Sequence, residues 1–412
     1  MVMSARRVYW LTEAFYPPIV GGQELFAAQV VRALAARGLE LSVITRQTEP
    51  PAPAAERIGA VEVRRLAPAG ILKGKGWRAV VPLVGFLLRL GFLLLRESRR
   101  FDVLIVSGVK IIPLVVVPVC VVTGKRCIVR AESFFELHES VSAESLQSMN
   151  PLSGRGIGRI AGVMRRFMLR RADFVVAISE QIRAQLLDSG VAASRIRDIP
   201  NAVDTDRFHP VTASKRAVLR ERHGLPAGKT VLIFSGRLSR AKGLPMLVEA
   251  WPALIARHPD LHLAIVGSGK SAFDDCEAAI RAFVQERHLA DSVQFAGESD
   301  QVHEYLQASD LFVFPTEYEG FSLALVEALA CAMPVVVTAV GAAPDLIREG
   351  ENGFLFPPKD PAALLAALFA ALAQRPRWEA IGAAARATVA PFDLAVVADR
   401  YRGLCEKTPA GG

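Results

Sequence analysis

Cysteine is scarce in this sequence, and the patterns that depend on it are missing. The 412 residues include five cysteines, and none forms a Cys-x-x-Cys pair or a His/Cys spacing typical of zinc sites. Residues 1–15 also lack the long apolar stretch of a secretory signal peptide. We therefore expect a cytoplasmic protein with no bound metal, whose cysteines are reduced and mostly lie in the core.

Two familiar nucleotide-binding patterns are missing as well. No Gly-x-Gly-x-x-Gly follows an opening strand, which argues against a nicotinamide-dependent dehydrogenase. Residues 224–230 resemble an ATPase phosphate loop but are one residue short and precede their strand. Residues 267–271 follow a strand, but Ala264 stands where the first glycine of that loop belongs. We expect no ATPase, but we keep Gly267 as part of a turn beside a ligand.

Charge is unevenly distributed between the two halves of the chain. Residues 1–200 contain 28 Lys and Arg against 16 Asp and Glu, and the remainder contains 21 against 25. The basic first half predicts an anionic partner or surface for that half alone. Because no helix-turn-helix, zinc-finger or RNA-binding pattern is present, we expect no nucleic-acid partner.

Short apolar strands alternate with helical stretches along the whole chain, which is typical of parallel α/β sheets covered on both faces. Two series of strands predict two doubly wound, Rossmann-like domains. We assign residues 1–200 to the first domain, 201–390 to the second, and 391–412 to a helix that packs back on the first. The predicted strands are residues 7–11, 39–45, 61–66, 103–107, 126–131 and 174–178, then 231–235, 262–266, 293–296, 311–315 and 335–338.

Two glycine-containing loops follow predicted strands and precede helices. The first contains Gly21 and Gly22, and its alternative interpretation is a tight turn that needs glycine for packing. The second contains Gly236, Arg237 and Lys242, at the sheet edge where such folds bind ligands. A forked guanidinium and a compact ammonium suit a diphosphate, and the alternative is a solvated basic loop.

A third segment, residues 317–331, follows the predicted strand 311–315. Glu319 and Gly320 lie at a helix start, and Glu327 is the only charged residue within the apolar stretch 321–333. A buried, unpaired carboxylate costs several kcal/mol, so Glu327 needs a cation or a ligand hydroxyl. The alternative is a structural ion pair or a solvent-facing position.

Together these segments resemble the retaining glycosyltransferases of family four, which have the GT-B fold. The resemblance covers nearly the whole chain. It rests on PPIVGG (17–22), SEQIRAQL (179–186), IPNAVDTDRFHP (199–210), GRLSRAKG (236–243), LAIVGSG (263–269) and the seven-residue spacing of Glu319 and Glu327 followed by AMPVV (332–336). It implies two Rossmann-like domains facing each other across a cleft.

The resemblance also implies roles for individual residues. Arg237 and Lys242 resemble the pair that holds the donor pyrophosphate, and Glu327 resembles the carboxylate that binds the ribose hydroxyls. Glu319 resembles the group that grips the transferred sugar, together with the backbone of the residues that follow it. Gly21 and Gly22 resemble a first-domain loop that closes on the donor. The residues that follow Glu319 and share this donor-binding role are Gly320, Phe321, Ser322 and Leu323.

One position departs from the family pattern. Many relatives place a histidine at the end of a first-domain strand, but here the strand 126–131 is followed by Glu132, and the nearest histidine is His138. A double displacement would need a first-domain carboxylate as nucleophile, and Glu132 is the one obvious candidate. We favour the front-face mechanism, which needs no enzymic nucleophile, and retain Glu132 as a candidate site residue.

The first domain contains two segments suited to a membrane surface. Residues 78–96 are strongly apolar, but Arg89 and Pro82 argue against a transmembrane span, leaving a buried helix or an interfacial one. Residues 155–171 form an arginine-rich helical stretch, by default a solvated face. With the basic charge of this half, they favour peripheral contact with the inner face of the cell membrane.

The expected activity is a retaining, metal-independent and cofactor-free transfer of a hexose from a nucleotide-diphosphate sugar. The expected acceptor is a hydroxyl of a lipid-linked or cell-surface glycan precursor, as in polysaccharide or glycolipid biosynthesis. Two alternatives stay open: a catalytically inactive nucleotide-sugar-binding protein and a sugar-nucleotide epimerase of the same fold. The donor base, the sugar, the linkage and the oligomeric state are not predicted.

Overall fold

The chain forms two compact units, each a mixed α/β structure. The computed structural model describes residues 6–12, 15, 22–47, 52–67, 77–109, 112–132, 155–270 and 274–406. The first unit consists of Met1–Asn201 with Leu394–Gly412, and the second of Ala202–Asp393. The unit boundaries thus follow Asn201 and Asp393, whereas the sequence analysis placed them after residues 200 and 390.

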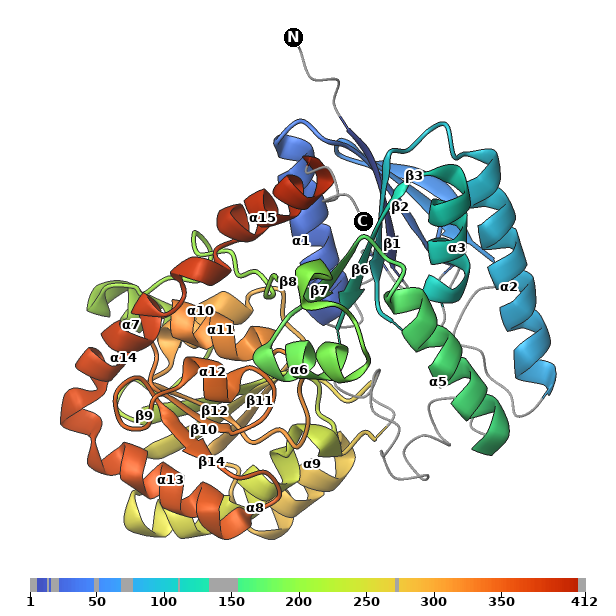
Figure 1. The fold of residues 1–412 in the computed structure, drawn as a ribbon. Coiled ribbons are helices and arrows are strands. Elements are labelled where there is room, and N and C mark those ends of the chain that lie inside the picture. Colours follow the sequence, from blue (N-terminus) through green and yellow to red (C-terminus); the bar gives the residue numbers. More distant parts are fainter. Residues whose placement is uncertain are drawn as a thin grey trace. The chain divides into compact units, whose positions relative to one another are not determined.

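The first unit is built on an eight-stranded sheet of order β3-β4-β2-β1-β5-β6-β7-β8 (Figure 1). All neighbouring strands are parallel except β3 and β4. The sequence predicted every strand except β3 and β8, which are short and partly exposed. The strands are β1 (Arg7–Thr12), β2 (Glu40–Arg46), β3 (Ala55–Ile58), β4 (Val61–Leu66), β5 (Val103–Ser107), β6 (Arg126–Ala131), β7 (Phe174–Ala177) and β8 (Ile196–Asp198).

Helices cover both faces of this sheet. On one face α1 packs against α15, and Arg37 Nε lies 2.7 Å from Asp399 Oδ1 across that contact. On the other face α3 lies beside both α2 and α5. The helices are α1 (Gly22–Ala36), α2 (Trp77–Arg96), α3 (Pro113–Thr123), α5 (Arg155–Leu169), α6 (Glu180–Asp188) and α15 (Leu394–Glu406). None of the helices in the described part of the chain is long and apolar enough to cross a membrane.

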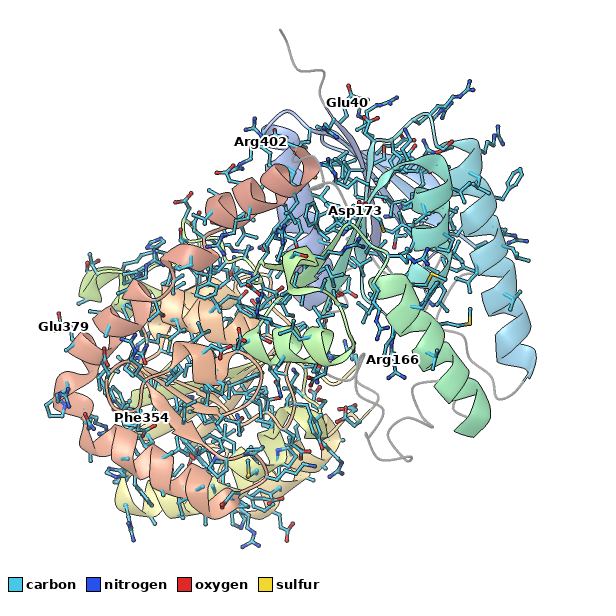
Figure 2. All side chains as sticks on the ribbon, in the orientation of Figure 1. Glu40, Arg166, Asp173, Phe354, Glu379 and Arg402 are labelled. Carbon is cyan, nitrogen blue, oxygen red and sulfur yellow. The ribbon has the colours of Figure 1, made fainter. Side chains whose placement is uncertain are left out.

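The second unit is built on a six-stranded, fully parallel sheet of order β11-β10-β9-β12-β13-β14. The sequence predicted all of these strands except β14, which has three residues and contains Phe354, labelled in Figure 2. The strands are β9 (Thr230–Ser235), β10 (Leu261–Val266), β11 (Val293–Gly297), β12 (Leu311–Phe314), β13 (Val335–Thr338) and β14 (Phe354–Phe356).

The helices of the second unit connect these strands in the order of the chain. Because the sheet is parallel, the carboxyl ends of β9, β10 and β12 lie at one edge, and the motif-bearing loops meet there. The elements are α7 (Ala213–Arg222), η3 (Arg240–Lys242), α8 (Leu244–Arg257), α9 (Glu277–Glu286), α10 (Val302–Ala308), α11 (Leu323–Ala330), α12 (Ala343–Leu346), α13 (Pro361–Ala373) and α14 (Trp378–Ala387).

Candidate functional site

The loops after β9 and β10 run against each other at the carboxyl edge of the second sheet. The backbone amide of Gly236 donates to the carbonyl of Val266 over 3.0 Å. At Gly267, φ is +135°, and a Cβ atom there would lie 1.9 Å from the Gly236 carbonyl oxygen. A side chain at Gly267 would therefore force the two loops apart, so this glycine shapes the edge of the site.

The loop after β9 is also fixed to the loop between β12 and α11. The amide of Glu317 donates to the Ala241 carbonyl over 2.8 Å, and Thr316 Oγ1 donates to the same oxygen over 3.2 Å. On the other side, a Cβ at Gly341 would lie 2.7 Å from the carbonyl oxygen of Glu319. The backbone around Glu319 is thus held between two neighbouring loops.

Lys242 and Glu319 join these loops through their side chains. Lys242 Nζ donates a hydrogen bond to Glu319 Oε1 and forms an ion pair with it. Each side chain is 17% exposed, and Nζ lies 5.4 Å from the ring centroid of Phe314. A cation and a carboxylate are therefore fixed side by side at the sheet edge, in partial contact with solvent.

The amino terminus of α11 follows Glu319 directly. Ser322 caps the helix, and its Oγ accepts the amide of Leu325 over 3.1 Å. The amides of residues 320–324 donate to no acceptor in the described part of the chain. Free amides at a helix start attract anions and hydroxyl oxygens, so this segment offers donors to a ligand. Gly320, Phe321, Ser322 and Leu323, all predicted from the sequence, lie in this segment.

Glu327 lies on α11, beyond the free amides. Its carboxylate makes no ion pair or hydrogen bond with any residue that the structure describes. Burial raises the pKa of Glu327 to about 7, and the charge of Arg207 opposes that shift. The structural ion pair considered in the sequence analysis is therefore not found among the described residues, and the ligand-binding role of Glu327 stays a prediction.

Arg237 lies two residues beyond the end of β9 and is exposed. Within the described ranges its guanidinium forms no ion pair or hydrogen bond. In the neighbouring loop, the backbone amide of Gly269 is already occupied, because it donates to Glu277 Oε2 over 2.9 Å. Arg237 is thus a free cation on the side of the sheet where Lys242 lies.

Lys359, which was not predicted from the sequence, contacts the β12–α11 loop from the segment that follows β14. Its Nζ donates to Tyr318 Oη over 2.7 Å and lies 3.1 Å from Glu317 Oε2. A lysine after a three-residue strand carries no local signal for such a contact. Lys359 therefore adds a third anchor for the loop that contains Glu319.

Glu132 lies in the first unit, one residue after β6. It forms a buried ion pair with Arg130 and is 5% exposed at its side chain. Arg130 also donates to Asn201 Oδ1, and its guanidinium carbon lies 3.9 Å from the ring centroid of Phe26. The contact between Arg130 and Asn201 was not predicted from the sequence, because the two residues are 71 positions apart in the chain.

The first-unit glycine loop is only partly covered by the structure. Gly21 and His138 lie outside the described residues. Gly22 is the first residue of α1 and is exposed. The predicted role of Gly21 and Gly22 in closing on a donor therefore stays a prediction.

Two parallel-sheet units, with cationic and acidic loop residues at the carboxyl edge of the second sheet, define a GT-B glycosyltransferase fold. The sequence profile described as Glycosyltransferase Family 4 matches residues 20–207, and that described as Glycosyl transferases group 1 matches residues 215–388. The chain therefore belongs to the GT-B glycosyltransferases of family four.

Relatives with solved structures or curated names agree with this assignment. Sucrose-phosphate synthase from Thermosynechococcus elongatus is 26% identical, with a TM-score of 0.78 over 97% of this chain and 98% of that one. The lipopolysaccharide core mannosyltransferase LpsB of Rhizobium meliloti is 33% identical over 53% of this chain and 60% of its own length. A D-inositol 3-phosphate glycosyltransferase of Acidothermus cellulolyticus is 29% identical over 83% of this chain and 76% of its own.

Proposed function

We propose that the protein transfers a sugar from a nucleotide-diphosphate donor to a hydroxyl acceptor with retention of the anomeric configuration. The observation that carries this proposal is the Lys242–Glu319 ion pair beside the free amides of residues 320–324. A cation, a carboxylate and a helix start in one loop cluster can hold a diphosphate and a sugar hydroxyl together.

The charges fit the charge changes of glycosyl transfer. Negative charge grows on the departing diphosphate, and Lys242 and Arg237 are the cations that stabilise it in this proposal. The α11 amino terminus adds its partial positive charge. Glu319 accepts hydrogen bonds from the transferred sugar, and Glu327 accepts them from the ribose.

We propose that this chemistry needs no metal ion, because in this proposal Arg237, Lys242 and the start of α11 supply the positive charge that stabilises the diphosphate. The chain has one Asp-x-Asp triplet, a pattern of paired carboxylates, at residues 204–206. Asp204 Oδ1 there accepts the amides of Asp206 and Arg207, each over 3.1 Å, and so caps a turn. Activity that survives a chelator supports this part of the proposal, and activity lost and restored by one added divalent cation contradicts it.

For retention we favour a front-face mechanism over a double displacement. Glu132 is engaged by Arg130 in a buried ion pair. Such a pairing stabilises the carboxylate and makes it a weaker nucleophile. The pair therefore favours a positioning role for Glu132.

We propose a lipid-linked or cell-surface glycan precursor as the acceptor. Among the relatives are the lipopolysaccharide core mannosyltransferase LpsB and a phosphatidylinositol monomannoside mannosyltransferase of Mycolicibacterium smegmatis, 30% identical over 63% of its length. The names of both relatives describe acceptors that are parts of the cell envelope. Peripheral contact of the basic first unit with the cytoplasmic side of the membrane would bring the protein to such an acceptor.

Incubation with UDP-, GDP- and ADP-sugars, with and without lipid extract, tests the proposal. Release of one nucleoside diphosphate, with the sugar moved to an acceptor or to water, supports transfer and identifies the donor. Binding without release supports the inactive nucleotide-sugar-binding alternative. Conversion of the donor sugar into an epimer supports the epimerase alternative.

A further inference from the structure

Exposed apolar side chains gather on one face of the first unit. Thirteen large apolar side chains are exposed in the described part of the chain, and nine of them lie on α2, α3 and α5. These three helices lie side by side on the same face of the sheet (Figure 1). We call this surface the apolar face; it consists of Val84, Leu88, Phe92, Leu95, Val121, Val122, Val163, Met164 and Phe167.

Helix α2 contributes the longest stripe of the apolar face. Leu88 is 70% exposed and Phe92 is 68% exposed, whereas Leu90 and Leu94 on the opposite side are buried. The spacing of Val84, Leu88 and Phe92 is one helical turn each, so they line one side of the helix. The sequence analysis left open whether residues 78–96 are buried or interfacial, and α2 has one buried and one exposed apolar side.

Helix α3 joins this stripe to α5. A Cβ atom at Gly91 would lie 3.1 Å from Val115 Cγ1, so α2 and α3 approach closely. The last turn of α3 exposes Val122, which is 79% exposed. On α5, Phe167 is 50% exposed and the guanidinium carbon of Arg171 lies 4.6 Å from its ring centroid. The apolar face therefore continues across all three helices.

The charged residues on the three helices of the apolar face all have one sign. Helices α2 and α5 contain arginines, α3 contains no charged residue, and none of the three contains aspartate or glutamate. Glu97 directly follows α2 in the sequence, but its side chain is buried and accepts hydrogen bonds from Arg64 and Tyr9. The arginines on or beside α2 and α5 include Arg89, Arg96, Arg99, Arg166 (labelled in Figure 2) and Arg171.

Several of these cations have no carboxylate partner. Among the described residues Arg89, Arg96, Arg99 and Arg171 form no ion pair. Large exposed apolar side chains bordered by unpaired arginines match the interface of an anionic bilayer, where the rings and aliphatic chains enter the acyl boundary and the guanidinium groups contact phosphates. An interface with a second copy of this chain would bring like charges together, which disfavours that occupant.

We infer that the apolar face docks on anionic phospholipid, with Leu88 and Phe92 inserted below the headgroups and Arg89 and Arg171 on the phosphates. The face lies wholly on the first unit, and its role does not depend on the transfer chemistry. It gives a location and an orientation to the membrane contact proposed above.

Vesicle co-sedimentation of the full chain tests this inference. We expect binding to vesicles that contain phosphatidylglycerol, weakened by high salt, and little binding to phosphatidylcholine alone. Leu88→Ser with Phe92→Ser should weaken binding by at least about tenfold, because two large apolar side chains leave the acyl boundary. Arg89→Gln with Arg171→Gln should weaken it and flatten its salt dependence. Val218→Ser, at a 49% exposed position of α7, is the matched control.

A second measurement reports insertion directly. Fluorescence of a Phe92→Trp variant should be quenched by brominated lipid more than that of a Val218→Trp variant. Donor hydrolysis without lipid, measured on the same variants, should stay unchanged, so failure of the membrane contact and failure of the transferase proposal are distinguishable. Equal vesicle binding by wild type and the Leu88/Phe92 variant overturns the inference. So does a wild-type dimer that this variant dissociates while no vesicle binding is seen.

Discussion

Lys242 and Glu319 form an ion pair although they are 77 positions apart in the sequence. They meet because β9 and β12 are adjacent in the sheet, so that the loops after both strands lie at one edge. The pair connects the phosphate-facing cation of our proposal to the carboxylate assigned to the sugar. Loss of either partner should therefore affect the function of the other.

Removal of this ion pair tests that coupling. Lys242→Ala and Glu319→Gln should each lower donor turnover by roughly 10²- to 10³-fold, the range typical for loss of one charge-stabilising group. The fold-loss of turnover in the double variant should be smaller than the product of the two single fold-losses, because each single change already breaks the ion pair. Arg402→Gln, which breaks an exposed pair with Glu406, serves as the control. If the fold-loss of kcat in the double variant equals the product of the two single fold-losses, the two groups act independently.

The raised pKa of Glu327 predicts a pH dependence of donor binding. A carboxylate accepts both ribose hydroxyls, whereas a protonated carboxyl has less acceptor capacity. With a pKa of about 7, donor affinity should rise between pH 6 and pH 8, and Glu327→Gln should flatten this rise. Calorimetric titration of the donor nucleotide over that range measures it. An identical pH profile in wild type and Glu327→Gln would assign the dependence to another group.

The same shift predicts a loss of stability with rising pH. In the folded state Glu327 keeps its proton up to about pH 7, whereas in the unfolded state it releases the proton near its ordinary pKa of 4.5. In this window the unfolded state binds fewer protons, so the stability contributed by Glu327 falls as pH rises. The Glu327→Gln variant should therefore show a smaller decrease of Tm between pH 5 and pH 8 than the wild type.

Gly267 should tolerate no side chain. In Gly267→Ala the new Cβ would meet the Gly236 carbonyl at 1.9 Å with φ at +135°, so the loops must separate. We expect a loss of at least about 2 kcal/mol in unfolding free energy and weaker donor binding. Gly228→Ala is the control, since nothing lies within 4 Å of its Cβ position. Chemical denaturation of both variants provides the comparison, and equal stability of the two would contradict this account of the loop contact.

Glu132 provides a test of the mechanism. Under the front-face mechanism Glu132→Gln should retain turnover within about tenfold, because glutamine can still accept the hydrogen bond of Arg130. Glu132→Ala should instead destabilise the first unit by about 3 kcal/mol, since it leaves the Arg130 cation buried without its carboxylate. A covalent glycosyl intermediate on Glu132, or abolished turnover in a stable Glu132→Gln variant, would favour double displacement.

Elements whose residues carry a local pattern were predicted from the sequence, and elements without such a pattern were not. Strands such as β9 and β12 are continuous apolar runs, so local sequence identifies them. β8, with one buried residue among three, has no such pattern and was missed. The ligand-binding role of Glu327 was inferred from a lone charge in an apolar stretch, and it stays a prediction.

Contacts between residues far apart in the chain could not be predicted from the sequence. The contacts Lys242–Glu319 and Arg130–Asn201 depend on which strands are adjacent and on the course of the linker. The exposed side of α2 could not be distinguished from its buried side by composition, because both are apolar. Those features required the structure.

The central claim is that Arg237 and Lys242 hold the diphosphate of a nucleotide donor in the second unit. Calorimetric titration of UDP, GDP and ADP into wild type, Arg237→Ala and Lys242→Ala tests it most directly. We predict that one of the three binds the wild type and that each variant binds it at least about tenfold more weakly, the loss expected for one charge-assisted contact. Unchanged affinity in both variants, or no binding of any nucleoside diphosphate, would contradict the claim.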